Sequence, residues 1–310
     1  MFPKKVCTII IPAYNMEKFI KRTLFSVIAN KDYAKYINIV VINDGSTDNT
    51  QKVVEKMASE HEGIYLINKE NNNWGSVINY AKHNNVLNSE YTMILDADDT
   101  ISRKFSKMLV DIVQKQDIDI AVFNTRIYYY KKLSVIINPK WFTKNQEKPF
   151  VPVLIPCSIV FKTKLLLESN DLVEGVSYQD YPMFCDMLSR SKKTKLISRV
   201  LGLYWYSRPG NTMTKPWGEK RLSQELILLD QLRKQGNDFL FAARVLLPGY
   251  LPGLSKANLV LKINENDYKK VIKCSSHFFK MIFKNRIKLS IKNKSVVFTK
   301  EETTICKRDN

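Results

Sequence analysis

The chain has 310 residues, of which 45% are hydrophobic and only 10 are glycine; this composition supports a folded core and excludes a generally disordered, collagen-like or low-complexity protein. Its 49 Lys and Arg residues exceed its 30 Asp and Glu residues, for a formal net charge of +19. Such an excess predicts attraction to nucleic acid, anionic lipid, a polyphosphate polymer or a nucleotide, or it serves only to keep the surface solvated.

The cysteines and the apolar runs indicate in which cellular compartment the protein is expected. Cys7, Cys157, Cys185, Cys274 and Cys306 lie far apart, and none forms a C-x-x-C pair. Zinc and redox motifs are therefore not indicated, and the lack of a disulfide framework favours a reducing compartment. No run of about 18 apolar residues is present, and the start, MFPKKVCTIIIPAYN, has no adequate signal-peptide h-region. We expect a cytoplasmic protein that is either soluble or peripheral on the inner face of the cell membrane.

Strand and helix patterns alternate through the first 125 residues. Short apolar runs predict buried strands, and apolar residues at helical spacing predict helices between them. The expected strands are Val6–Ile11, Ile37–Ile42, Ile64–Ile67, Tyr91–Leu95 and Ile118–Phe123, and the expected helices are Met16–Ala29, Thr47–Met57, Val77–Leu87 and Ser102–Gln114. This alternation predicts an α/β fold with an open, mainly parallel sheet flanked by helices.

The pattern loosens after about residue 125. The expected elements are an antiparallel strand at Ile127–Ile137, a loop at Asn138–Pro156, helices at Phe161–Leu167 and Pro182–Leu188, and one or two strands within Lys195–Tyr206. Beyond Lys215 the chain is mostly helical in pattern, and Tyr268–Leu289 is basic and amphipathic. That stretch predicts either an interfacial helix on an anionic membrane or a packed helix with a solvated basic face.

Polar clusters follow three of the expected strands: PAYN the first, NDGSTD the second and DADD the fourth. Ligands of open α/β sheets bind beyond the carboxyl ends of the strands, so these segments are expected to converge on one crevice. Asp96, Asp98 and Asp99 would repel one another there, and a divalent cation would relieve the repulsion. The alternative is a helix N-cap formed by Asp99 or Thr100. Asp44, in the second cluster, either accepts N–H donors from a base edge or closes a turn.

The segments IIIPAYNMEKFI, IVVINDGSTDNT and YTMILDADD, in this order and spacing, resemble the family 2 glycosyltransferases of the GT-A fold. The resemblance is dense over residues 5 to 125 and thinner to about residue 210. It implies a nucleotide-sugar donor, usually a UDP-sugar, inversion at the anomeric carbon, and Mn²⁺ or Mg²⁺ as cofactor.

The same resemblance implies roles for individual residues. Pro12, Ala13, Tyr14 and Asp44 match positions that hold the nucleoside. Asp96 and Asp98 match the D-x-D pair, so both are expected at the metal: Asp98 in direct contact and Asp96 nearer the ribose or the sugar.

A fourth element, EGVSYQDYPMFCDML, resembles the segment in which many relatives carry a Glu-Asp pair. The chain has Gln179-Asp180 there, so Asp180 is the expected general base for the acceptor hydroxyl. General-base catalysis of this kind contributes about 10²–10⁴-fold. Because Asp180 precedes Pro182, it could instead cap a helix, and the two roles are compatible.

Two further segments bear on the phosphates of the donor. YWYSRPGNTM resembles the segment in which an Arg or His contacts the diphosphate, so Arg208 is expected to stabilise the leaving group or else to pair with a nearby carboxylate. NNNWGSVINYA lacks the Arg that many relatives have, and Asn72, Asn79 or Lys82 is expected to replace it. Trp74 in the same segment either stacks on a sugar or packs in the core.

The resemblance predicts a catalytic domain over residues 1–215, with a nucleotide-sugar-binding half at 1–125 and an acceptor half at 126–215. Residues 216–310 are then a mostly helical, basic C-terminal region. The net charge favours a surface-glycan acceptor, either a lipid-linked oligosaccharide or an anionic cell-wall polymer. The alternatives are a non-catalytic nucleotide-sugar-binding protein and a nucleic-acid-binding protein. Nucleic acid is not the expected partner, because no recognition element interleaves basic and aromatic residues.

Overall fold

The computed structural model describes residues 3–115, 118–130, 133–144, 153–208, 210–214, 217–246 and 250–308. The chain divides into two compact units: Met1–Asn138 with Leu154–Pro209, and Pro139–Val153 with Gly210–Asn310. The domain boundary predicted at residue 215 and the division into donor and acceptor halves remain predictions.

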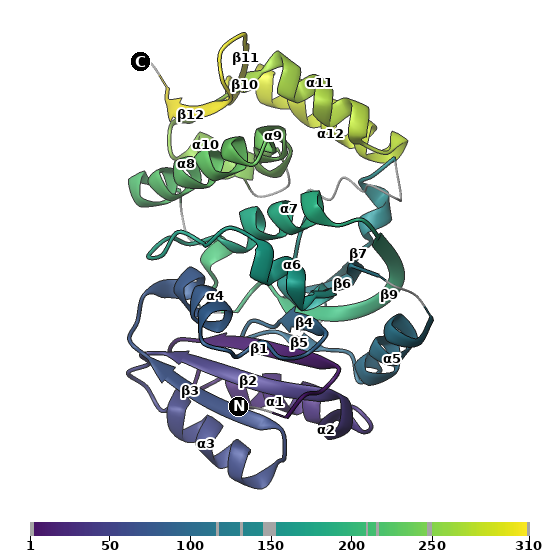
Figure 1. Cartoon of the computed structure of the whole chain (residues 1–310). Coiled ribbons are helices and arrows are strands. Elements are labelled where there is room, and N and C mark those ends of the chain that lie inside the picture. Colours follow the sequence, from purple (N-terminus) through teal and green to yellow (C-terminus); the bar gives the residue numbers. More distant parts are fainter. Residues whose placement is uncertain are drawn as a thin grey trace. The chain divides into compact units, whose positions relative to one another are not determined.

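The first unit is built on one mixed sheet (Figure 1). Within the described residues its strands run in the order β3-β2-β1-β4-β8-β6-β9-β5, with β7 paired to β6. Their bounds are β1 Cys7–Ala13, β2 Ile37–Asp44, β3 Ile64–Lys69, β4 Tyr91–Ile94, β5 Thr100–Ile101, β6 Ile120–Tyr130, β7 Leu133–Ile137, β8 Ile159–Lys162 and β9 Thr194–Trp205. Strands β1 to β4 are parallel, β8 is antiparallel to both of its neighbours, and β6 is parallel to β9. The predicted fold class is therefore confirmed.

Helices cover both faces of this sheet. Their bounds are α1 Ile20–Ile28, α2 Tyr33–Tyr36, α3 Thr50–Glu60, α4 Asn73–His83, α5 Phe105–Lys115, α6 Thr163–Glu168 and α7 Asp180–Arg190. On β1, Ile9 and Ile11 belong to the core cluster that also contains Leu24 of α1 and Val54 of α3. Ile10 points to the opposite face and is equally buried. Figure 1 shows α4 on that opposite face. Because both faces are covered, the strands carry continuous apolar runs.

Register brings the ends of the parallel strands together. Ala13 on β1 is paired with Asn43 on β2, and Ile10 is paired with Ile94 on β4. The residues that follow β1, β2 and β4 therefore leave the same edge of the sheet.

Two expectations for the middle of the chain are corrected. Phe161–Leu167 is not one helix: Ile159–Lys162 forms β8, and α6 begins only at Thr163. The apolar residues of β8 are β-branched or aromatic and pair with β4 and β6 on either side, which favours the strand. The expected loop at Asn138–Pro156 contains the 3₁₀ turn η1 (Pro139–Trp141), and a second turn, η2 (Pro156–Ser158), follows; residues 145–152 lie outside the described residues. The antiparallel pairing predicted for Ile127–Ile137 is confirmed, as β7 against β6.

The second unit is mostly helical, as predicted, but it also contains a small sheet. Its elements are η3 Thr212–Thr214, α8 Glu219–Lys234, α9 Asp238–Val245, α10 Tyr250–Lys256, α11 Glu265–Cys274, α12 His277–Lys292, β10 Leu259–Asn264, β11 Val296–Thr299 and β12 Thr304–Lys307. β10 lies between β11, which is parallel to it, and β12, which is antiparallel. Among the helices in the described part of the chain, none has both the length and the apolar character needed to span a bilayer.

The basic stretch Tyr268–Leu289 is divided between α11 and α12. The break lies at Ser275 and Ser276, where the Ser276 hydroxyl caps α12 by accepting from the backbone N–H of Phe279 (3.2 Å). One stripe of α12, with Phe279 and Phe283, is buried. α12 is therefore packed along this stripe, as the second alternative expects, and the interfacial role of its exposed side chains stays a prediction.

Candidate active site

The loops after β1 and β2 interlock. The backbone N–H of Asn15 donates to the Ser46 hydroxyl (3.0 Å), and the Asn15 side chain accepts from the backbone N–H of Thr47 (2.8 Å). Of the residues expected to hold a nucleoside, Pro12 and Ala13 end β1 and are buried, whereas the Tyr14 side chain is exposed. These contacts fix the PAYN segment against the NDGSTD segment.

Asp44 ends β2 and is nearly buried. Its carboxylate Oδ1 accepts from Lys69 Nζ (2.6 Å) and from the backbone N–H of Asn72 (3.1 Å). Gly45 has φ +66°, and a Cβ there would lie 2.9 Å from the backbone N of Asn71. Glycine is therefore required for the chain after β3 to approach Asp44 this closely.

A pocket of about 580 Å³ opens beside these residues, lined by Lys69, Asn71, Asn72, Ser76, Asn79 and Glu174 among others. Amide, hydroxyl and charged groups dominate this lining. Such a surface suits a polar ligand held by hydrogen bonds.

The three carboxylates after β4 have three different surroundings. Asp96 Oδ1 accepts from Trp74 Nε1 (3.0 Å). Burial, and then repulsion from Asp180, raise the pKa of Asp96 to about 6, although the Trp74 hydrogen bond and the charge of Arg208 act in the opposite direction. Asp180 is the first residue of α7, so two carboxylates from distant segments repel one another in the crevice.

Asp98 is held at two points. Its carboxylate forms an ion pair with Arg208 Nε, and its backbone carbonyl accepts from Arg22 Nη2 (2.6 Å). The Arg208 guanidinium also lies over the Phe19 ring, 5.4 Å from its centroid. The alternative foreseen for Arg208, pairing with a carboxylate, is therefore realised in this state of the protein.

Asp99 is fully buried and its Oδ1 accepts from the backbone N–H of Trp205 (3.0 Å). Burial, and then repulsion from Asp96, raise the pKa of Asp99 well above its ordinary value. Asp99 therefore binds β9 rather than the helix that follows it, and it belongs to the scaffold.

The residues present fit a divalent cation. Within the described residues, no three His, Cys, Asp or Glu side chains lie close enough to hold a metal ion by themselves. Mg²⁺ and Mn²⁺ in nucleotide sites commonly take one or two carboxylates and complete their coordination with phosphate oxygens and water. Asp98 and Asp96 are hard oxygen donors of that kind, so they would hold the cation together with a diphosphate.

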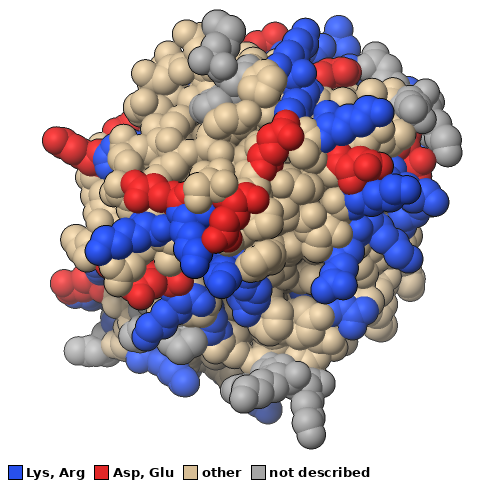
Figure 2. All heavy atoms as spheres, turned by 90° about the horizontal axis from the view of Figure 1, so that it is seen from below, with Lys and Arg blue, Asp and Glu red and all other residues tan. Residues whose placement is uncertain are grey.

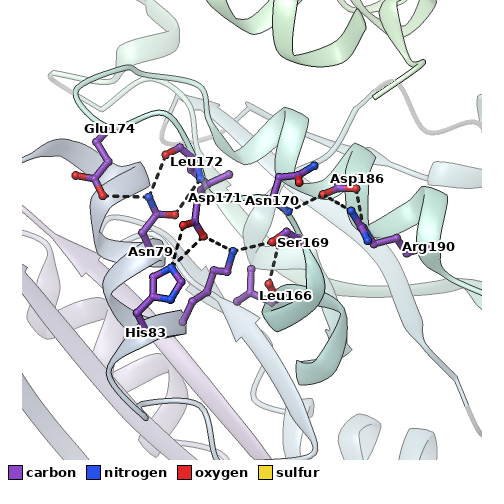
Figure 3. Close-up of polar contacts among 11 residues, drawn as sticks. Asn79, His83, Leu166, Ser169, Asn170, Asp171, Leu172, Glu174, Asp186 and Arg190 are labelled. Carbon is purple, nitrogen blue, oxygen red and sulfur yellow. Dashed lines mark hydrogen bonds and ion pairs between the residues drawn. The ribbon is translucent and has the colours of Figure 1, made fainter. Parts of the chain in front are cut away.

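The chain before Asp180 is fastened to α4 (Figure 3). The Asn79 amide donates to Leu172 O (3.0 Å) and Glu174 Oε1 (3.0 Å) and accepts from Leu172 N (2.9 Å). The buried Lys82 ammonium donates to Asp171 (2.6 Å), which also contacts the exposed His83 ring. These side chains position the segment that leads to α7. The predicted role of Asn79 in donor binding stays a prediction.

Gln179 and Tyr178 complete that segment. Gln179 occupies the N-cap position of α7, and its side-chain carbonyl accepts from the backbone N–H of Val173 (3.0 Å). Tyr178 has φ +67°, a conformation that side chains rarely adopt and that is commonly retained at functional sites. Asp180 thus begins the helix rather than capping it.

Three residues of the site were not predicted from the sequence: Lys69 against Asp44, Arg22 against Asp98, and Trp74 as a donor to Asp96. For Trp74 only stacking or packing was expected. None belongs to a local pattern, since each acts on a residue 22 or more positions away.

Comparisons with known proteins agree with this geometry. The sequence matches the family described as glycosyl transferase family 2 over residues 8–166. An uncharacterised glycosyltransferase of Mycoplasma pneumoniae is 34% identical over 230 residues, which cover 73% of this chain and 77% of that protein. TarS of S. aureus in complex with UDP-GlcNAc has a TM-score of 0.65 at 17% identity, over 94% of this chain and 89% of that chain. The mannosyltransferase PcManGT of Pyrobaculum calidifontis, in complex with GDP-Man and Mn²⁺, has a TM-score of 0.59 at 15% identity, over 94% and 87%.

Proposed function

This chain belongs to glycosyl transferase family 2, and we propose that it transfers a sugar, with inversion, from a UDP-sugar to a hydroxyl group of a surface-glycan acceptor, with Mn²⁺ or Mg²⁺ as cofactor. One observation carries the proposal: the carboxylates of Asp96 and Asp180, from segments 84 positions apart, are close enough to repel one another. An acid whose pKa is raised by burial and by a second carboxylate is typical of a site that binds a cation or moves a proton.

The donor site combines the loops after β1 and β2 with the D-x-D segment. Asp44 would accept an N–H from the base, framed by Pro12, Ala13 and Tyr14. Asp98, with Asp96 beside it, would hold the cation, which neutralises charge on the leaving diphosphate. The similarity in fold to TarS, whose structure contains UDP-GlcNAc, supports a uridine nucleotide.

The transfer step requires one base. Asp180 would accept the proton of the acceptor hydroxyl while that oxygen bonds to the anomeric carbon and the bond from that carbon to the diphosphate oxygen breaks. Arg208, which is paired with Asp98, would donate to the departing diphosphate. Attack from the face opposite the leaving group inverts the anomeric centre.

The acceptor is a lipid-linked oligosaccharide or an anionic polymer in this proposal, and α12 brings the protein to the cytoplasmic face of the membrane. Phe278, Met281 and Leu289 are 52%, 53% and 60% exposed. The helix, HFFKMIFKNRIKLSIK, has five Lys and Arg residues and no acidic residue. Exposed apolar side chains beside lysines suit an anionic bilayer surface. By contrast, Figure 2 shows basic and acidic side chains interspersed on another face of the molecule.

The donor proposal is tested by thermal unfolding with a series of UDP- and GDP-sugars, with and without Mn²⁺. We expect one UDP-sugar to stabilise the protein only with metal, and Asp98→Ala to abolish the effect. Removing a side chain that only positions a metal ligand lowers metal affinity about 10–100-fold. Removing Asp98, the proposed metal ligand itself, should lower it at least as much. The control is Asp111→Ala on α5, which removes an ion pair to Arg199 and leaves the residues of the candidate site in place.

Two results would count against the proposal. Metal-dependent stabilisation that survives in Asp98→Ala would remove this residue from the metal site. Donor binding without transfer to any lipid or polymer acceptor would favour the alternative, a non-catalytic nucleotide-sugar-binding protein.

The membrane proposal is tested with vesicles of phosphatidylcholine with and without phosphatidylglycerol. We expect Phe278→Asp with Met281→Asp to weaken binding to the anionic vesicles by about tenfold or more, because each apolar side chain loses its burial. The matched control is Leu226→Asp with Ile227→Asp on α8, two apolar residues that are also exposed. Equal binding by both double variants and the unmodified protein would contradict the proposal.

A further inference from the structure

A second pocket of the first unit, of about 570 Å³, is lined by three arginines. They come from three elements: Arg22 from α1, Arg103 from the turn after β5, and Arg126 from β6. The other lining residues include Phe25 and Trp205, and no acidic residue is among them.

Each arginine is placed by the fold. Arg22 stacks on the Trp205 ring, 4.3 Å from its centroid, and donates to the backbone carbonyl of Asp98. Arg126 lies in the middle of the sheet's far half, with Leu203 of β9 and Ile136 of β7 as its register partners. Arg103 is exposed. In the described part of the chain, neither Arg103 nor Arg126 forms an ion pair, whereas nearby Arg199 is neutralised by Asp111.

Three guanidinium groups around one cavity repel each other unless an anion joins them. The planar fork of arginine matches the oxygens of a phosphate group, and charged hydrogen bonds of this kind are about twice as strong as neutral ones. Phe25, which is 43% exposed, adds an aromatic face against which a sugar or glycerol unit can pack. The volume lies within the range of small-molecule sites.

The pocket adjoins the D-x-D segment. Asp98 turns its carboxylate to Arg208 and its backbone carbonyl to Arg22, and Thr100, two residues on, lines the pocket. Trp205, which stacks on Arg22, donates its backbone N–H to Asp99 Oδ1 and its ring Nε1–H to the Thr100 hydroxyl (3.3 Å). Asp98, Thr100 and Trp205 therefore connect the candidate metal site with the arginines.

We propose that this pocket binds a phosphate group of the acceptor, so that the acceptor is phosphate-bearing rather than a neutral glycan. The identification of the ligand as an acceptor rests on the proposed glycosyl transfer, whereas the anion site itself depends only on the arginines. The phosphate could belong to a phosphodiester polymer or to a lipid headgroup, and the experiment separates these sources.

The test measures binding of two probes: a synthetic tetramer of glycerol phosphate, and vesicles of phosphatidylcholine with and without phosphatidylglycerol. The proteins are the unmodified chain, the double variant Arg103→Ala with Arg126→Ala, and a control that also loses two charges, Lys52→Ala with Lys107→Ala. Both control lysines are exposed and lie outside the pocket. Metal-dependent thermal stabilisation by UDP is recorded in parallel for all three.

We expect the arginine variant alone to lose about tenfold or more in affinity for the tetramer, with the UDP effect unchanged. Loss of vesicle binding in that variant, with no tetramer binding by the unmodified chain, would assign the phosphate to a lipid headgroup and also support the site. The inference is overturned if the lysine control weakens equally, if the arginine variant binds like the unmodified chain, or if the unmodified chain binds neither probe. If UDP stabilises none of the proteins while phosphate binding still depends on the arginines, the proposed transfer fails and the anion site stands.

Discussion

Each unit of this molecule buries a cluster of charged side chains, and the two clusters differ in sign. In the first unit, Asp96 and Asp99 are carboxylates whose pKa values are raised by burial and by neighbouring acids. In the second unit, the fully buried Glu225 lies between two arginines, with Arg221 Nε at 3.8 Å and Arg244 Nη2 at 4.0 Å from its Oε1.

Aromatic rings complete the second cluster. Arg221 lies over the Trp217 ring at 4.5 Å, and Arg244 Nε donates to the Tyr250 hydroxyl (2.8 Å). The Glu225 carboxylate offsets one of the two guanidinium charges, and the aromatic faces stabilise the guanidinium groups, so these buried charges find their partners within the cluster. The carboxylates of the first unit have an excess of one sign, so they need a ligand from outside. The comparison thus separates a cluster that stabilises the fold from the cluster that we propose binds the cation and the donor.

Replacing Asp180 gives the largest expected effect. Asp180→Asn keeps the size of the side chain but cannot take a proton, so the transfer rate should fall about 10²–10⁴-fold. Metal-dependent donor binding should remain, and the pKa of Asp96 should fall, because Asp180 contributes to raising it. The measurement is release of nucleoside diphosphate from the stabilising donor in the presence of lipid and polymer acceptors, with Asp111→Asn as the control. Undiminished release would mean that the repulsion in the first cluster has no catalytic purpose.

Neutralising Glu225 tests the second cluster. Glu225→Gln leaves two buried arginines without their shared carboxylate, and breaking a buried pair of this kind costs about 3–5 kcal/mol of stability. The control is Glu219→Gln, on the same helix as Glu225. It removes an exposed ion pair with Lys307 and should cost under about 1 kcal/mol of stability. Urea unfolding of both variants gives the comparison. A cost as small as that of the control would show that the arginines do not depend on Glu225.

Asp96→Asn should raise the stability of the folded chain, whereas Glu225→Gln should lower it. Because the folded pKa of Asp96 is raised from its ordinary 3.8 to about 6, the folded state holds this proton more tightly than the unfolded state. The associated stability is complete below the ordinary value and is lost as the pH rises through about 6. Without metal at neutral pH, Asp96→Asn should therefore be more stable than the unmodified chain by up to about 3 kcal/mol. Trp74 can still donate to the new amide oxygen.

The difference should vanish as the pH falls toward 4, which thermal unfolding across that range would reveal. Asp48→Asn is the control of opposite sign. Burial acts to raise the pKa of Asp48, but hydrogen bonds from Thr50 and from the backbone N–H of Glu17 together lower it. Its loss should thus reduce stability at neutral pH. A stabilisation by Asp96→Asn that is independent of pH would mean that ionisation of the Asp96 carboxylate does not destabilise the folded state.

The sequence could predict the first unit's sheet and the gathering of its acidic loops because both depend on local patterns. Apolar runs mark buried strands, and parallel strands necessarily end at one edge. It could not predict the partners of those acids. Arg208 lies 110 positions from Asp98, and Leu172 lies 93 positions from Asn79, so only the folded chain brings these groups together. β8 and the small sheet of the second unit were missed for a related reason, since such short strands are defined by the neighbours that pair with them.

The burial of the cysteines has a practical consequence. Cys7, Cys157 and Cys185, all of the first unit, are shielded from solvent, whereas Cys274 and Cys306 of the second unit are partly accessible. Burial also raises the pKa of the Cys7 thiol, so little of it is thiolate. A maleimide fluorophore or spin label added to the native, unmodified chain would consequently attach to the second unit alone. Its emission or mobility would test the proposed membrane contact of that unit without placing a label in the candidate active site.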